Sequence, residues 1–365
     1  MKRVAILTFD LNWVFLGGAK SGGASVVSKN LILELAKNPD IELTIICKGF
    51  PKVKIDNANI INFTEYKNLS DLYKKMEEKV KTENYDIVLT TNLECLKFNP
   101  IIQSQTFIHR CNNEIFPINF IKKFFGTNKI KKQNNQFKDL PKENIYFAVS
   151  KSVKDDYVKN YKLNPENVHV CHLGCEQVYA NMPDITKQDF ITFGCVANNS
   201  VNKGGHLFIL GLFVLKVLGC KNFKAKIISK SLKESKLLST FFKVIGLSKN
   251  LEFLEPTDNI LEYYKSLDCL VLPSKNEAFG LVALETMSCG KPCIISSTTG
   301  VAEIINHNEN GLIFNRNSFF DFVKQLKIMY KIYHSKKYDD LAQNAFLTSQ
   351  LYTWKNFVNS ILKCF

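Results

Sequence analysis

Short apolar, β-rich runs alternate with longer helical patterns along most of the 365 residues, and this alternation constrains the fold more than any other feature. Such alternation is typical of parallel sheets whose strands are joined by crossover helices. The pattern predicts strands over residues 4–9, 43–47, 87–90, 106–109, 146–150, 169–173, 191–196, 224–228, 251–253, 269–273, 292–296 and 312–314. It predicts helices over 24–37, 69–81, 151–161, 204–218, 233–245, 260–266, 281–289 and 319–334. The sequence therefore predicts an α/β fold of doubly wound sheets.

The length predicts two domains, because a single hydrophobic core stops growing beyond roughly 250–300 residues. A polar stretch over 177–190 predicts the linker between a first domain, 1–176, and a second domain, 191–345. The last segment, 346–365, is expected to be a closing helix. Ligands of doubly wound sheets bind beyond the carboxyl ends of the strands, so two facing sheets predict one cleft between them.

Composition predicts a soluble globular protein, with 45% hydrophobic and 22% charged residues. No apolar run reaches the roughly 18–20 residues that a membrane span needs. The apolar run after the basic start ends at Asp10 with no small-residue cleavage pattern, so it predicts a buried strand rather than a signal peptide. The eleven cysteines are scattered and odd in number, which favours reduced, buried thiols over disulfides or a metal site. We expect a cytoplasmic protein.

The net charge of +14 raises the possibility of a nucleic-acid partner. Only three of the basic residues are arginine (Arg3, Arg110 and Arg316), whereas base recognition favours the guanidinium group. We therefore expect no nucleic-acid partner and favour anionic small molecules or anionic lipid. The stretch 118–138 has six lysines and no acid, interleaved with phenylalanine and isoleucine. It predicts a peripheral contact with an anionic membrane, on which a lipid-linked acceptor is presented; a solvated lysine-rich helix and loop is the alternative.

The segment 274–290 combines two carboxylates with a helix start. Glu277 lies in the loop after a predicted strand, and Glu285 lies about two turns into the following helix. Carboxylates so placed can hold the two ends of one polar ligand. The amides at the helix start favour a phosphate or another anion, because the helix dipole is positive there; they belong to Ala278, Phe279, Gly280, Leu281 and Val282.

Five further residues are candidates for ligand contact. Gly22 and Gly23 open the first helix, where glycine lets the backbone approach a phosphate; a flexible loop is the alternative. His109 ends a predicted strand and faces the ligand edge, unless it is a structural histidine. Lys203 begins a helix before paired glycines and can neutralise a phosphate, unless it is an ordinary surface lysine, and Asn198 nearby adds a neutral donor.

Taken together, these motifs resemble the retaining GT-B glycosyltransferases of family 4 (glycosyl transferases group 1) across nearly the full chain. The second half carries the specific motifs: NKGG, DCLVLPSKNEAFGLVALETMSCGKPCI, and TGVAEII followed by NGLIF. SGGAS, FIHR and the ending YTWKNFVNSILKCF agree more loosely. The resemblance implies a GT-B fold, in which two Rossmann-like domains face each other across a cleft and the C-terminal helix crosses back to the first domain.

The resemblance also implies roles for the site residues. Glu277 contacts the donor sugar at the reacting face, and Glu285 holds the nucleotide ribose. Lys203 binds the donor diphosphate, against which the loop of Gly22 and Gly23 lies. His109 touches the transferred sugar. No cofactor is implied, because the nucleotide-sugar, a UDP- or GDP-sugar, is a substrate.

The chain departs from the family at Ala197, where an arginine usually precedes the lysine by about six residues. One positive contact to the leaving diphosphate is therefore missing, and a neutral asparagine donor such as Asn198 stabilises developing charge less. No Asp-x-Asp pair occurs in the chain, so we expect a metal-independent reaction.

The sequence thus predicts a hexosyltransferase that uses a nucleotide-sugar and a glycan or lipid-linked acceptor in bacterial surface polysaccharide synthesis. We expect it in the cytoplasm or peripherally on the inner face of the membrane. The alternatives are a sugar-nucleotide epimerase of GT-B fold and a non-catalytic protein that binds nucleotide-sugars or glycans.

Overall fold

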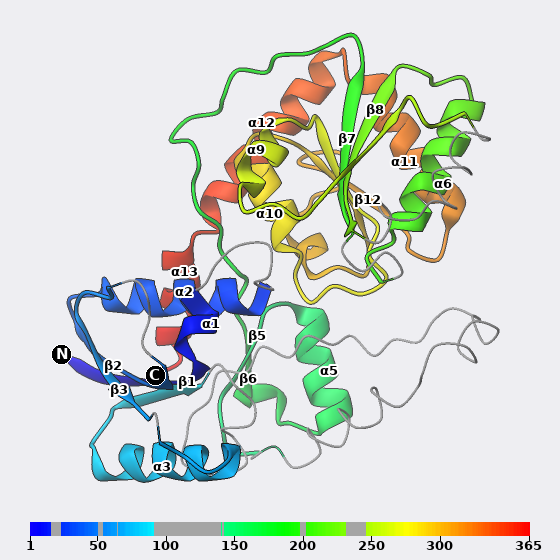
Figure 1. Cartoon of the computed structure of the whole chain (residues 1–365). Coiled ribbons are helices and arrows are strands. Elements are labelled where there is room, and N and C mark those ends of the chain that lie inside the picture. The colour runs from blue at the N-terminus through cyan, green and yellow to red at the C-terminus, as the bar shows by residue number, and fades with distance from the viewer. Residues whose placement is uncertain are drawn as a thin grey trace. The chain divides into compact units, whose positions relative to one another are not determined.

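The computed structural model of the chain describes residues 1–15, 23–49, 54–63, 65–90, 140, 142–197, 202–230 and 246–365. The chain divides into two compact units (Figure 1). The first unit contains Met1–His172 together with Phe357–Phe365, and the second unit contains Leu173–Asn356. The predicted strand 106–109, the predicted helix 233–245 and the lysine-rich stretch 118–138 lie outside the described residues.

The first unit is built on a parallel sheet with the strand order β3-β2-β1-β4. Its strands are β1 (Lys2–Asp10), β2 (Ile41–Lys48), β3 (Ala58–Asn62) and β4 (Ile87–Thr90), and a separate parallel pair contains β5 (Tyr146–Ala148) and β6 (Val168–Val170). Its helices are α1 (Leu11–Phe15), α2 (Gly23–Ala36), α3 (Leu69–Thr82), α5 (Lys151–Tyr161) and the 3-10 helix η3 (Pro165–Asn167). Helices α2 and α3 cover opposite faces of the four-stranded sheet (Figure 1).

Side chains from strands and helices close the core of this unit. Leu72 and Met76 of α3 are fully buried against Ala5 and Leu7 of β1. At the other end of the chain, the ring of Phe365 lies 6.1 Å from that of Phe147, centroid to centroid. The last residues therefore pack in the first unit, as the resemblance predicts for the closing helix.

The second unit is built on a six-stranded parallel sheet with the order β12-β11-β10-β7-β8-β9. Its strands are β7 (Ile191–Val196), β8 (Phe223–Ile228), β9 (Leu251–Leu254), β10 (Cys269–Leu272), β11 (Cys293–Ser296) and β12 (Leu312–Phe314). The chain adds β8 and β9 on one side of β7 and then returns to add β10 on the other side. This reversal between β7 and β10 is the switch point at which doubly wound sheets bind ligands.

Helices cover both faces of this sheet. They are α6 (Gly205–Val217), α9 (Ile260–Lys265), α10 (Leu281–Ser288), the 3-10 helix η4 (Gly300–Ile304), α11 (Phe319–Ile332) and α12 (Lys336–Leu351). The last helix, α13 (Trp354–Leu362), belongs to the first unit from Phe357 onward. Figure 1 shows α6 and α11 on one side and α9, α10 and α12 on the other. Buried Phe208 and Leu212 of α6, with Phe322 and Leu326 of α11, join the core cluster on their side.

The predicted α/β class and parallel sheets are confirmed. Most predicted strands and helices end within one or two residues of the observed bounds. The strand predicted to end at Ser150 ends at Ala148. The Ser150 hydroxyl instead caps α5, because it accepts a hydrogen bond from the amide of Val153. Strand β3 and helices α1 and α12 were not predicted. Helix α12 runs continuously past the expected boundary at 345, and the predicted roles of the domains stay predictions.

Candidate functional site

The switch point of the second sheet brings two predicted residues into contact. Lys203 follows the carboxyl end of β7, and Glu277 follows the carboxyl end of β10, the neighbouring strand. The ammonium of Lys203 forms an ion pair with Oε2 of Glu277. The glutamate side chain is only 14% exposed and the lysine 37%, so water screens this pair less than a surface pair. The two groups therefore form one charged centre at the edge where doubly wound sheets generally bind their ligands.

Close backbone packing holds the two loops together. The amide of Lys275 donates to the carbonyl oxygen of Asn202 at 2.8 Å. Gly204 has φ +70°, and a Cβ placed there would lie 2.1 Å from the carbonyl oxygen of Pro273. Only glycine combines this left-handed backbone with so close an approach. The predicted glycine after Lys203 thus sets the distance between the loops.

The loop of Glu277 is also fixed from its other side, by η4. The amide of Gly300 donates to the carbonyl oxygen of Glu277 at 3.0 Å, and the amide of Val301 donates to that of Phe279 at 2.7 Å. The N–H of Gly300 thus positions the Glu277 loop.

Helix α10 begins directly after this loop. Its N-cap is Gly280, with φ +111°, and no side chain among the described residues caps it. Ala278 and Phe279 are buried, whereas Leu281 and Val282 are half-buried. The helix start therefore lies beside the Lys203–Glu277 centre and presents its positive end there.

Glu285 lies farther along α10 and has a partner of its own. The hydroxyl of Tyr264, on α9, donates to its Oε2 at 2.7 Å. Burial raises the pKa of Glu285, the Tyr264 hydrogen bond opposes this shift, and the negative charge of Glu176 adds to it. The carboxylate is thus held in a fixed orientation by a buried tyrosine.

Tyr264 is a site residue that the sequence reasoning missed. Its phenol is buried and has a pKa well above the ordinary value because of that burial and the nearby Glu285 charge. The paired tyrosines in ILEYYK were a visible signal, because a fully buried tyrosine normally needs a hydrogen-bond partner.

The other predicted site residues are placed as follows. Gly22, His109 and Asn198 lie outside the described residues, and Gly23 is the exposed first residue of α2 in the first unit. Ala197 is fully buried, and its amide donates to the carbonyl oxygen of Ile228 at 2.9 Å.

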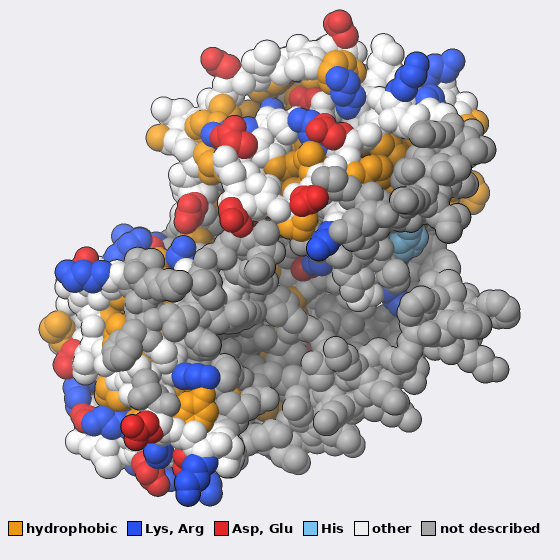
Figure 2. Space-filling view, viewed as in Figure 1, with side chains coloured by type: hydrophobic (Ala, Val, Ile, Leu, Met, Phe, Trp, Pro, Cys, Tyr) orange, Lys and Arg blue, Asp and Glu red, His pale blue; other side chains and the backbone are white. Residues whose placement is uncertain are grey.

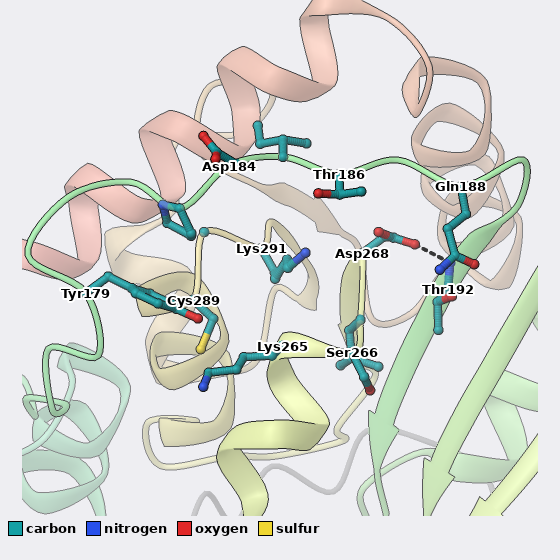
Figure 3. Close-up of a pocket in the computed structure, with 14 residues that line it drawn as sticks. Tyr179, Asp184, Thr186, Gln188, Thr192, Lys265, Ser266, Asp268, Cys289 and Lys291 are labelled. Atoms are coloured by element: carbon teal, nitrogen blue, oxygen red, sulfur yellow. Dashed lines mark hydrogen bonds between the residues drawn. The ribbon is translucent and has the colours of Figure 1, made fainter.

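A separate pocket of about 300 Å³ lies at the opposite, amino-terminal edge of the same sheet (Figure 3). The segment from Tyr179 to Gln188 forms one wall, and the start of β7 and the residues before β10 form another. The carboxylate of Asp268 accepts from the amide of Thr192 at 2.7 Å, and burial raises its pKa. Asp268 therefore joins the starts of the two central strands, and we assign it a structural role.

The surface and the remaining groups add three observations. On the face in Figure 2, acidic and basic side chains are interspersed over the described surface instead of forming one continuous basic patch. In the part of the chain that the structure describes, no group of three His, Cys, Asp or Glu side chains could hold a metal ion. None of the described helices is long and apolar enough to cross a membrane.

Residues 195–348, which contain this site, match the family model of the glycosyl transferases group 1. Over 344 residues the chain is 22% identical to an uncharacterized glycosyltransferase of Haemophilus influenzae, with 90% of each protein aligned. The match to the family model therefore covers the part of the chain in which the specific motifs lie.

Solved structures resemble the whole chain. A glycosyltransferase of Rickettsia africae matches with a TM-score of 0.72 at 16% identity, over 100% of this chain and 97% of that one. HepE of Anabaena, solved with UDP, matches with a TM-score of 0.70 at 16% identity, over 100% and 99% of the two chains; it has also been solved with UDP-glucose. These likenesses confirm the predicted GT-B fold.

Proposed function

We propose that this protein is a retaining, metal-independent glycosyltransferase of family 4 that moves a hexosyl group from a nucleotide-sugar to a glycan or glycolipid acceptor. The observation that carries the proposal is the Lys203–Glu277 centre, which lies at the switch point of the sheet and beside the start of α10. HepE, a protein of the same fold, binds UDP and UDP-glucose, which favours a UDP-sugar as the donor.

The residues of the second unit divide the donor between them. Lys203 and the amides at the start of α10 hold the diphosphate, and Glu277 contacts the sugar. Glu285, oriented by Tyr264, accepts from the ribose hydroxyls. The diphosphate competes with Glu277 for the ammonium of Lys203. Binding of the nucleotide-sugar therefore replaces one ionic contact of Lys203 with another. This exchange costs less free energy than the loss of a buried ion pair.

Cleavage of the bond between the anomeric carbon and the phosphate oxygen leaves negative charge on the diphosphate. A hydrogen-bond donor that is already positioned beside this developing charge raises the reaction rate by roughly 10²–10³. With Ala197 in the place of the usual arginine, Lys203 and the helix amides carry this work among the described residues.

The proposal extends to Gly23, at the start of α2, and to residues outside the described part. Gly22 and Gly23 lie against the diphosphate, Asn198 donates a neutral hydrogen bond to it, and His109 contacts the transferred sugar. The lysines of 118–138 bring the enzyme to an anionic membrane, on whose inner face it acts in bacterial surface polysaccharide synthesis.

A donor panel tests this function. UDP-, GDP- and ADP-sugars are incubated with the full chain, with and without EDTA and with candidate acceptors, and the products and their anomeric configuration are followed by NMR. We expect hydrolysis or transfer with one donor class and retention of configuration, insensitive to EDTA. Glu277→Ala should abolish turnover, while Glu309→Ala, an exposed acid in the same unit, should not.

Three outcomes contradict the proposal. Donor binding without hydrolysis or transfer leaves a nucleotide-sugar binding protein, and an epimerised donor sugar identifies an epimerase. Full turnover by Glu277→Ala removes the Lys203–Glu277 centre from the mechanism.

A further inference from the structure

Helix α6 has apolar side chains on all sides, which is expected of a helix buried all round. One face packs on the core through residues such as Phe208 and Leu212. The opposite face is nevertheless open: Leu210, Val217 and Leu218 are 50%, 68% and 48% exposed. The spacing of these residues places them on one stripe, because positions three, four, seven and eight apart share a helix face. Exposed apolar side chains aligned along one helix face form a candidate interaction surface.

Helix α11 extends this surface. The two helices lie side by side (Figure 1), since a Cβ on Gly211 of α6 would lie 2.5 Å from the ring of Phe322 on α11. Near the ends of the helices, the amide of Asn222 donates to the hydroxyl of Tyr330 at 3.3 Å. Phe320, in the first turn of α11, is 87% exposed. We call the outward sides of the two helices the α6–α11 face.

The two helices of the α6–α11 face carry more basic than acidic side chains. Helix α6 contains Lys216, helix α11 contains Lys324, Lys327 and Lys331, and the one acid of the two helices is Asp321. On α11, Lys324 and Lys331 are exposed. The carboxylate of Asp321 is engaged within the fold, where it accepts from the amide of Asn315 and the side chain of Gln325.

We propose that the α6–α11 face docks on an anionic lipid bilayer, with its apolar side chains in the interface and its lysines on the headgroups. Exposed leucine, valine and phenylalanine flanked by lysine is the composition of a surface that binds such membranes. A second copy of the chain is a poorer partner, because a two-fold contact would bring Lys324, Lys327 and Lys331 against their own counterparts. The proposal does not depend on the proposed function or on the stretch 118–138.

Vesicle flotation with the full chain tests this inference. The vesicles contain phosphatidylcholine alone or with about a third phosphatidylglycerol. We expect binding to the anionic vesicles only, weakened by salt. The triple variant Leu210→Asn, Val217→Asn, Phe320→Ser should lower the partition coefficient at least about tenfold, because three apolar side chains no longer enter the bilayer.

The matched control is the double variant Leu347→Asn, Leu351→Asn on α12, whose leucines are 51% and 69% exposed but lie on another helix. It should bind like the wild type. Thermal melts check that the triple variant is folded.

Each of three results overturns the proposal. The first is equal binding by the triple variant and the wild type. The second is equal binding to neutral and anionic vesicles. The third is a wild-type dimer in sedimentation that the triple variant disperses, which identifies the face as a self-contact.

Discussion

Replacing Gly204 with alanine tests whether the two loops of the candidate site meet as closely as the structure describes. Gly204 follows Lys203, and its backbone has φ +70°. The new Cβ would lie 2.1 Å from the carbonyl oxygen of Pro273, which is backbone and cannot rotate away. The loop that carries Glu277 must therefore move away from Lys203.

The loss of stability expected for Gly204→Ala has two contributions. A left-handed conformation costs a residue with a Cβ about 1–2 kcal/mol. Overpacking against a fixed neighbour adds about 1–3 kcal/mol. The free energy of unfolding of the second unit should fall by roughly 2–5 kcal/mol in total.

Gly219→Ala is the matched control, because Gly219 has φ +89° and nothing within 4 Å of the added Cβ. The Gly219→Ala variant has the free-energy cost of the left-handed backbone but no steric clash at the added Cβ. In thermal melts, Gly204→Ala should unfold roughly 2–12 °C below Gly219→Ala, at about 2–4 °C per kcal/mol for a unit of this size. Donor hydrolysis should fall in the first variant only. Coinciding melts and activities of the two variants would refute the close approach of the loops.

Three further predictions concern individual site residues. Lys203→Met should lower donor turnover by roughly 10²–10³ and remove the thermal shift given by UDP; an unchanged rate contradicts the diphosphate role. Tyr264→Phe should raise the donor KM several-fold with kcat nearly unchanged, because Glu285 loses its orienting donor, and a change in kcat alone argues against this. For Glu285→Gln, the raised pKa of the native carboxyl means that the folded protein holds this proton more tightly than the unfolded chain. In the wild type, Glu285 contributes stability below its pKa in the unfolded chain, and this contribution is lost as the pH rises through its pKa in the folded protein. Glutamine does not titrate, so the Tm of Glu285→Gln minus the Tm of the wild type should increase from acidic to neutral pH. A difference that does not depend on pH contradicts the raised pKa.

The sequence predicted most elements of the second unit because their signals are local. The strand 191–196 and the strand 312–314 are short apolar runs bounded by polar residues, and both are observed with the predicted bounds. Strand β3 was missed because its residues are only partly buried and therefore carry little apolar signal. Helix α12 was missed because its sequence mixes polar and apolar residues, and the side that is buried depends on its contact with α10.

Within the site, the sequence predicted the residue types but not their partners. Glu277 and Glu285 were expected to hold the two ends of one ligand, because they share one strand–loop–helix segment. Their observed partners, Lys203 and Tyr264, lie 74 and 21 residues away in the chain. Periodicity in the sequence does not reveal such pairs, because they depend on which strands and helices become neighbours.

The strand order explains why Lys203 is the cation of this centre. The loops after β7 and β10 can meet only because β10 returns to the side of β7 that β8 leaves free. Lysines elsewhere on the sheet, such as Lys224 and Lys226 on β8, lie along a strand and not beyond its carboxyl end, so they are not placed at this switch point. Ala197 is fully buried at the end of β7, and an arginine there would have to leave the core to reach a ligand. In the proposed mechanism, the diphosphate charge that the resembled family usually binds with two cationic side chains is bound, among the described residues, by Lys203 and the start of α10. Lys203 is therefore the most demanding single test of that mechanism.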